Sequence, residues 1–246
     1  MKIFCIRRNE GIMPIVDFKS IFEGGNLSVP SSSYVLASMM TRDEEKDVSA
    51  SVISGLEKRV NYYIQDKHYL WRLFASAGVF LILYLFMSLA IRDPLPMLDE
   101  ILIASVGAFI TWILIAKHDT NARFAIKTKN EWRDSVIAAD LEYSNTMEFV
   151  DEYMAKLETI GFKDLIKMLA DGDVPLYEDE MVDGLDKALD SLLYYTKKLE
   201  AKYIKQLNKG NFDPVKMKKS LMQDYTLGNL DVYLLAFILG YSRKSK

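Results

Sequence analysis

The chain has 246 residues, of which 50% are hydrophobic and 26% are charged, and its formal net charge is −3. This charge balance gives no reason to expect a nucleic-acid partner. The single cysteine, Cys5, excludes an internal disulfide, and no Cys/His set has the spacing of a metal site. We therefore expect neither a metal centre nor a bound cofactor.

Residues 1–41 are predicted to form an N-terminal cytoplasmic segment that is partly disordered or contains short strands. Lys2–Arg8 is typical of a short strand, whereas the Gly- and Ser-rich residues 24–33 are typical of a loop. From Arg42 onward, apolar residues recur every three or four positions, as Val48, Val52, Leu56 and Val60 show. This period predicts a cytoplasmic helix over residues 42–72 that leads into a membrane.

Two apolar runs follow, and neither contains a charged residue. Residues 73–91 would make a helix of about 28 Å, and residues 101–116 a helix of about 24 Å, against a bilayer core of about 30 Å. Starting the second run at Met97 would restore its length. The pattern predicts a transmembrane hairpin over residues 73–116, with an outside loop at 92–100 that contains two prolines. A buried helical hairpin in a soluble core is the alternative.

Basic residues on either side of the hairpin indicate its orientation. The flanks carry Lys58, Arg59, Lys67 and Arg72 on one side and Lys117, Arg123, Lys127, Lys129 and Arg133 on the other, whereas the loop carries Arg92 alone. The positive-inside rule then places both termini in the cytoplasm and the loop outside. We expect an integral protein of the plasma membrane or of a bacterial inner membrane.

The second span carries the candidate ion-attracting residues. Asp99 and Glu100 lie in its first turn, where acids complement the helix dipole. In an oligomer, a ring of these acids could instead concentrate cations at a pore mouth. Ser105 and Thr111 belong to a set of small and hydroxyl residues that would line such a pore or let helices pack closely. Two helices cannot enclose a pore, so conduction requires a homo-oligomer.

Both histidines of the chain flank the membrane on the same predicted side. His68 precedes the first span and His118 follows the second, with Asp66 and Asp119 nearby. Such an arrangement could form a pH-responsive or metal-binding gate. Ordinary interfacial polar residues are the alternative interpretation.

The residues from 117 to 246 are predicted to form a C-terminal cytoplasmic helical domain. One long helix is expected from Val136 to Gly161. A second carries an a/d seam over three heptads: Val182, Leu185, Leu189, Leu192, Thr196, Leu199 and Tyr203. The seam could pack in a bundle within the chain or in a coiled coil between subunits. The apolar run at 232–239 is too short to span a membrane, and we expect a buried helix there, with a helix lying on the membrane as the alternative.

Together these patterns predict an all-α integral membrane protein with a two-helix hairpin and long cytoplasmic helices that form a helical bundle or coiled coil. No catalytic motif indicates an enzyme. The first functional hypothesis is a homo-oligomeric cation channel whose second span lines the pore and whose cytoplasmic helices assemble and gate it. The alternative is a membrane-anchored interaction or effector protein without a pore. The expected partners are the lipid bilayer, other copies of the chain and inorganic cations.

Overall fold

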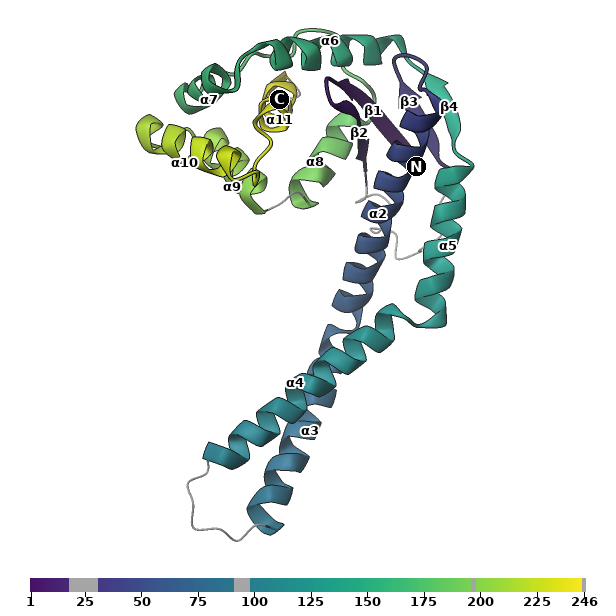
Figure 1. Ribbon diagram of the computed structural model, residues 1–246, viewed down its shortest axis with the longest axis vertical. Helices are drawn as coiled ribbons and strands as arrows, with labels where there is room; N and C mark the ends of the chain where they lie inside the picture. The colour runs from purple at the N-terminus through teal and green to yellow at the C-terminus, as the bar shows by residue number, and fades with distance from the viewer. Residues whose placement is uncertain (18–30, 91–97, 196–197, 245–246) are drawn as a thin grey trace. The chain divides into compact units, whose positions relative to one another are not determined.

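The computed structural model describes residues 1–17, 31–90, 98–195 and 198–244 (Figure 1). The chain divides into two compact units. Met1–Ile53 and Asp134–Lys246 form the first, which we call the mixed unit, and Ser54–Arg133 forms the second, the hairpin unit. The N-terminal segment and the C-terminal region thus share one unit, and the hairpin unit is inserted between them.

The described chain is mostly helical, as expected, but the mixed unit also contains a four-stranded sheet, so the fold is not all-α. The strands β1 (Lys2–Arg8), β2 (Gly11–Val16), β3 (Ser33–Leu36) and β4 (Asp140–Tyr143) lie in the order β2-β1-β3-β4. β1 pairs antiparallel with β2 across a tight turn, where Gly11 has a φ of 129° that favours glycine. β1–β3 and β3–β4 are parallel pairs. The strand expected at Lys2–Arg8 is confirmed.

β4 interrupts the long helix that was expected from Val136 to Gly161. Instead, α5 (Arg123–Ile137) ends before the strand, and α6 (Asn145–Thr159) begins after it. β4 pairs in register with β3, from Ser33 opposite Asp140 to Leu36 opposite Tyr143. The backbone N–H and C=O groups of residues 140–143 thus bond to β3 instead of to a continuous helix. Pairing with a distant strand has overridden the local helical pattern.

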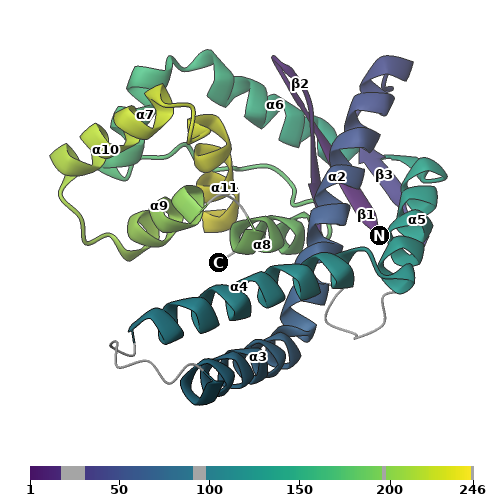
Figure 2. The same ribbon diagram turned by 60° about the horizontal axis from the view of Figure 1, so that its bottom comes forward.

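Among the described residues, five further helices belong to the mixed unit (Figures 1 and 2). They are α7 (Phe162–Asp171), α8 (Leu185–Tyr195), α9 (Lys198–Lys209), α10 (Pro214–Thr226) and α11 (Val232–Lys244). α11 packs against α6, α7, α8 and α9, and Phe237 and Ile238 are completely buried. The expectation of a buried C-terminal helix is therefore confirmed. In both views α7 and α10 lie side by side.

The described residues of the predicted a/d seam fall mainly on α8 and α9, whereas Val182 precedes α8. Residues 196 and 197, which include the seam position Thr196, lie outside the described residues. α8 begins at Leu185, directly after Gly184, whose φ is 85°. The buried seam residues belong to the core of the mixed unit: Val182, Leu185, Leu189 and Tyr203. The seam thus packs within the chain, which was the first of the two expectations.

Two helices of the hairpin unit, α3 (Tyr69–Ala90) and α4 (Leu98–Thr120), have apolar surfaces that are largely uncovered. α2 (Arg42–Lys67), which begins in the mixed unit, confirms the helix expected from Arg42. α3 and α4 are long and apolar enough to cross a membrane by length and composition. Only 11% and 6% of their most apolar windows are buried. They are therefore not buried core helices of the part of the chain that the structure describes. Most of the predicted loop, residues 91–97, lies outside the described residues.

The hairpin unit leaves and rejoins the sheet at two neighbouring strands. It follows β3 and precedes β4, which pair directly. Hydrogen bonds extend this pairing at both ends, from the Asp140 N–H to the Ser32 carbonyl (3.1 Å) and from the Ser144 N–H to the Leu36 carbonyl (2.8 Å). The Tyr34 hydroxyl, on β3, lies 2.9 Å from Ser49 Oγ of α2 and donates to the Val136 carbonyl of α5 at 3.1 Å. The sheet thus holds both ends of the insertion together.

Candidate functional site

The packing of α3 on α4 depends on small residues. A β-carbon added at Gly107 would overlap Leu83 Cδ1, so the absence of a side chain lets the two helices approach closely. Near the other end, the rings of Tyr69 and Trp112 meet edge to face with their centroids 5.5 Å apart. Ala104 is completely buried. The hairpin is therefore a packed antiparallel pair with large apolar side chains on its outer faces.

The predicted pore residues of α4 do not share one face. Asp99, Ser105 and Thr111 are six residues apart, and at about 100° per residue they point in three directions about 120° apart. Ser105 is exposed, whereas the Thr111 hydroxyl donates to the Gly107 carbonyl of its own helix at 2.8 Å. A pore axis that runs beside α4 could therefore contact at most one of these three residues directly.

Glu100 and Thr111 lie on nearly the same side of α4, since eleven residues turn the helix through about three full turns plus 20°. That side also carries Gly107, which packs on α3. Glu100 is accordingly half-buried, whereas Asp99 is exposed. Both acids lie in the first turn of α4, where the free N–H groups and the helix dipole stabilise negative charge. Within the described residues, neither acid forms a salt bridge that would neutralise it.

A polar cluster lies where α3 begins and α4 ends. His68 Nδ1 lies 3.2 Å from Asp119 Oδ2, an ion pair when the imidazole is protonated. Arg72, one turn beyond His68, is 96% buried, and its guanidinium lies 5.0 Å from the centroid of the Trp112 ring. Its Nη2 donates to the Gln65 carbonyl. His118, the second predicted sensor, is exposed and forms no ion pair with any described residue.

The cluster differs from the sequence-based expectation in two respects. The structure brings His68 to Asp119 but leaves His118 outside the contact. Arg72 was counted only as a flanking charge, although it is the buried cation of the group. The four-residue spacing of His68 and Arg72 indicated that they share a helix face. Their partners on α4 depend on the register of the two helices, which the spacing does not give.

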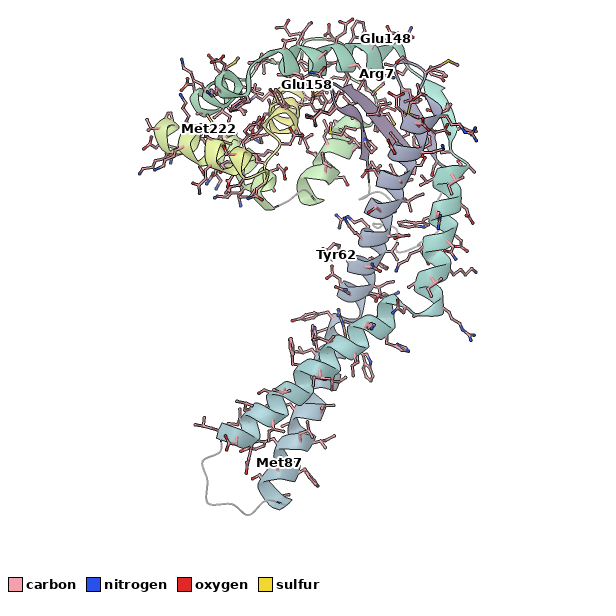
Figure 3. All side chains as sticks on the ribbon, in the orientation of Figure 1. Arg7, Tyr62, Met87, Glu148, Glu158 and Met222 are labelled. Atoms are coloured by element: carbon pink, nitrogen blue, oxygen red, sulfur yellow. The ribbon has the colours of Figure 1, made fainter. Side chains whose placement is uncertain are left out.

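A second charged cluster holds the mixed unit together. Glu158, which Figure 3 labels on α6, accepts a hydrogen bond from Arg8 Nε at 2.9 Å. Arg8 Nη1 donates to Asp231 at 2.6 Å. Asp231 also accepts the N–H groups of Tyr233 and Leu234, which open α11. Arg8 thereby links β1, α6 and α11. The cluster satisfies buried charges and helix ends, which is a structural task.

Two further residues of the mixed unit have pKa values raised by burial. Asp151 accepts the Arg7 N–H at 2.8 Å, but removal of its carboxyl from water raises its pKa to about 6. Burial, with a smaller contribution from Asp151, raises the pKa of the Cys5 thiol to about 12. Cys5 is therefore a poor nucleophile. Among the residues that the structure describes, no group of three or more His, Cys, Asp or Glu side chains could hold a metal ion.

No protein-family model matches the chain, and no curated protein or solved structure matches it at a significant level.

Proposed function

We propose that the chain is a two-span membrane protein that self-associates through its hairpin and holds the mixed unit in the cytoplasm as an interaction module. The observation that carries this proposal is the apolar surface of α3 and α4. Large side chains on both helices are between 42% and 76% exposed: Leu73, Phe74, Leu81, Ile82, Leu85, Phe86, Leu89, Leu98, Ile101, Leu102, Ile103, Val106, Phe109, Ile110, Ile113 and Leu114. Contiguous apolar surface of this extent needs lipid or a protein partner to cover it.

The flanks of the hairpin support the same arrangement. Arg72 is buried beside Trp112 at the end of the hairpin that adjoins α2 and α5, and Lys117 and His118 occupy the last turn of α4 at that end. Aromatic and basic side chains are favoured at the cytoplasmic interface of a membrane. Asp99 and Glu100 occupy the opposite end of α4, where the outside loop is expected.

Membrane insertion and topology can be tested with single cysteines. Cys5 is 2% exposed and the pKa of its thiol is raised, so this native cysteine should not react with the labelling reagent. In intact cells, Arg92→Cys should react with a membrane-impermeant maleimide. Met39→Cys, at a position 79% exposed in the mixed unit, should react only after permeabilisation. Extraction of the protein by alkaline carbonate, or equal labelling of both variants in intact cells, would refute the proposal.

A cation pore is the second candidate function. The observation that favours it is the pair of acids at the start of α4, with Asp99 exposed at the end of the span. In an oligomer these carboxylates would form a ring that raises the local cation concentration. Cation flux into proteoliposomes should then fall when Asp99→Asn and Glu100→Gln are combined.

The positions of the two hydroxyl residues on α4 allow a second test of the pore. Ser105 and Thr111 lie on different sides of α4, so a pore lined by this helix should expose one of them and not the other to water. Ser105→Cys and Thr111→Cys should therefore differ strongly in block by a water-soluble thiol reagent. If flux is absent from both the unchanged protein and the acid variant, the anchor remains and the pore is rejected.

A further inference from the structure

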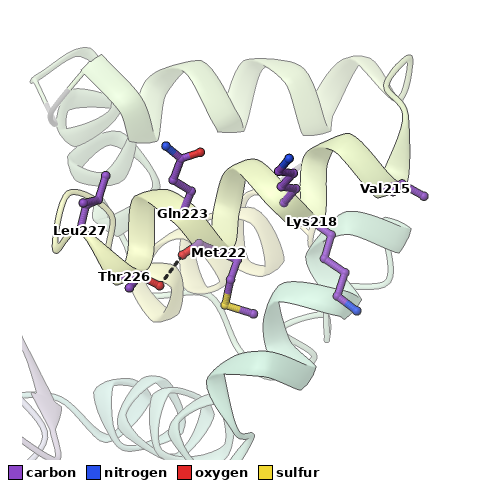
Figure 4. A pocket seen from close by; sticks show the side chains of 7 residues that line it. Val215, Lys218, Met222, Gln223, Thr226 and Leu227 are labelled. Atoms are coloured by element: carbon purple, nitrogen blue, oxygen red, sulfur yellow. Dashed lines mark hydrogen bonds between the residues drawn. The ribbon is translucent and has the colours of Figure 1, made fainter.

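An open groove runs along the outer face of α10. Its volume is about 640 Å³. The lining residues that the structure describes come from α10 and its C-terminal cap: Val215, Lys218, Lys219, Met222, Gln223, Thr226 and Leu227 (Figure 4). Val215 and Leu227 are 77% and 62% exposed. The groove therefore combines uncovered apolar side chains with two lysines, and a ligand with an apolar residue beside carboxylates would fit it.

The same unit carries a segment with the opposite charge. Residues 171–183 contain six acids and no Lys or Arg. Within this segment, exposure alternates: Leu176, Glu178 and Glu180 are exposed, whereas Tyr177 is buried. Leu176 is 53% exposed, although it is a large apolar residue. We call residues 175–180 the acidic strap. Its outward side presents one leucine followed by two glutamates.

Buried tyrosines fix the conformation of the acidic strap through hydrogen bonds to backbone groups. The Tyr153 hydroxyl donates to the Pro175 carbonyl at 2.7 Å, and the Tyr177 hydroxyl donates to the Glu180 carbonyl at 2.7 Å. Just beyond the strap, the Val182 N–H donates to the Tyr241 hydroxyl at 3.0 Å. A loop held in this way loses little conformational entropy when it binds, so its outward side is preorganised for a partner.

We propose that the α10 groove of one copy receives the acidic strap of a second copy. Leu176 enters the apolar part of the groove beside Leu227, and Glu178 and Glu180 extend along the helix toward Lys218 and Lys219, which lie about 12–14 Å from Leu227. This inference rests on the proposed self-association in a membrane, and it names the contact that the cytoplasmic parts make. Because the two surfaces differ, the contact is head to tail, and repetition closes it into a ring or extends it.

A second copy accounts for both surfaces at once. An anionic bilayer would attract Lys218 and Lys219 but would repel the acidic strap. A contact of this size is small for a free complex in solution. Hairpins that associate in the bilayer would supply the missing affinity, because they raise the effective concentration of each cytoplasmic surface near the other.

Disulfide cross-linking of the full-length protein in native membranes tests the contact. Leu176→Cys and Leu227→Cys are placed on separate, differently tagged copies that are co-expressed, and Cys5 stays buried. Mild oxidation should join the two tags in a dimer. The matched control pairs Leu176→Cys with Met39→Cys, whose position is also highly exposed in the mixed unit. Cross-linking no greater than in this control would overturn the inference.

Charge reversal then tests the electrostatic part. Lys218→Glu with Lys219→Glu on the Leu227→Cys copy should reduce the cross-link several-fold. Glu178→Lys with Glu180→Lys on the Leu176→Cys copy should restore most of it. A bilayer as occupant predicts the loss without the rescue, and that result would also overturn the inference. Carbonate extraction of the same membranes separates the two proposals. Protein that stays in the membrane without cross-linking defeats the contact alone, whereas protein that is extracted defeats the proposed anchor.

Discussion

Gly240 of α11 and Pro175 of the acidic strap approach so closely that a β-carbon on Gly240 would lie 2.5 Å from the Pro175 carbonyl oxygen. The same β-carbon would overlap the Tyr153 hydroxyl, which donates to that carbonyl. The contact between α11, Tyr153 and the acidic strap therefore leaves no space for a side chain at position 240.

Gly240→Ala should destabilise the mixed unit. One obstacle is backbone and the other is a hydrogen-bonded hydroxyl, so neither can move aside freely, and overpacking of this kind costs about 1–3 kcal/mol. We expect the unfolding midpoint to fall by about 2–4 °C per kcal/mol lost. Gly161→Ala is the control, since a β-carbon there meets only Asp164 Oδ2 at 3.8 Å. Equal thermal melts of the two variants would contradict this account of the contact.

Substitutions at Gly107 should have graded effects. A single methyl meets the flexible end of Leu83, which can rotate, so Gly107→Ala should be tolerated. Gly107→Leu should separate α3 from α4, because the helices can no longer approach closely. Pairs of spin labels on the two helices would measure this separation. Gly78→Leu, where an added β-carbon meets nothing within 4 Å, should leave the distance unchanged.

The stability of the mixed unit should depend on pH through Asp151. Its folded pKa, about 6, lies above the unfolded value because burial disfavours the carboxylate. The folded state therefore binds a proton more tightly, and stability falls as pH rises from about 4 to about 6. Asp151→Asn keeps an acceptor for the Arg7 N–H and should remove this decline. After allowance for solvent screening, we expect a gain of about 1 kcal/mol at pH 7. Denaturant melts at pH 4.5 and pH 7 would measure it, and an unchanged pH dependence would exclude Asp151 as the cause.

If the protein responds to pH near neutrality, the response should depend on His68 and not on His118. His68, which immediately precedes α3, lies 3.2 Å from Asp119 of α4, and the two form an ion pair only when the imidazole is protonated. His118 has no such partner among the described residues. His68→Gln should therefore flatten the pH dependence of hairpin association, or of flux, between pH 5.5 and 8, while His118→Gln should not. The reverse result would move the sensor to the exposed histidine.

The mixed unit should fold without the hairpin unit. The chain leaves the sheet at β3 and returns at β4, and these strands are paired neighbours. Replacement of residues 54–133 by a flexible Gly/Ser linker should give a water-soluble protein with a cooperative thermal transition. Circular dichroism and gel filtration would check this. Loss of the transition would show that the sheet needs the inserted helices.

Two helices were predicted correctly from simple apolar patterns. Apolar residues at every third or fourth position predicted α2, and a short uncharged apolar run predicted the buried helix α11. β4 was missed because all four of its residues are exposed, so no apolar alternation marks it. The beginning of α8 at Leu185 was missed because the a/d spacing already starts at Val182.

The candidate site also combines features that could be predicted from the sequence with features that could not. That Asp99, Ser105 and Thr111 point in three directions follows from their six-residue spacing and could have been derived from the sequence. The pairing of His68 with Asp119 could not, because it depends on how two distant helices align. The groove on α10 and the acidic strap also depend on which side of each segment the core covers, and the core includes residues from both ends of the chain.

The insertion of the hairpin between β3 and β4 has a consequence for biosynthesis. A ribosome releases β1, β2 and β3 first, then α3 and α4, and only afterwards the strand and helices that complete the sheet and its core. The early strands must wait as an incomplete sheet with an unpaired edge while the apolar helices are synthesised. If the hairpin enters a membrane as proposed, folding of the mixed unit would follow that insertion in time. A nascent chain that fails to insert would then carry both an open strand edge and an uncovered hairpin.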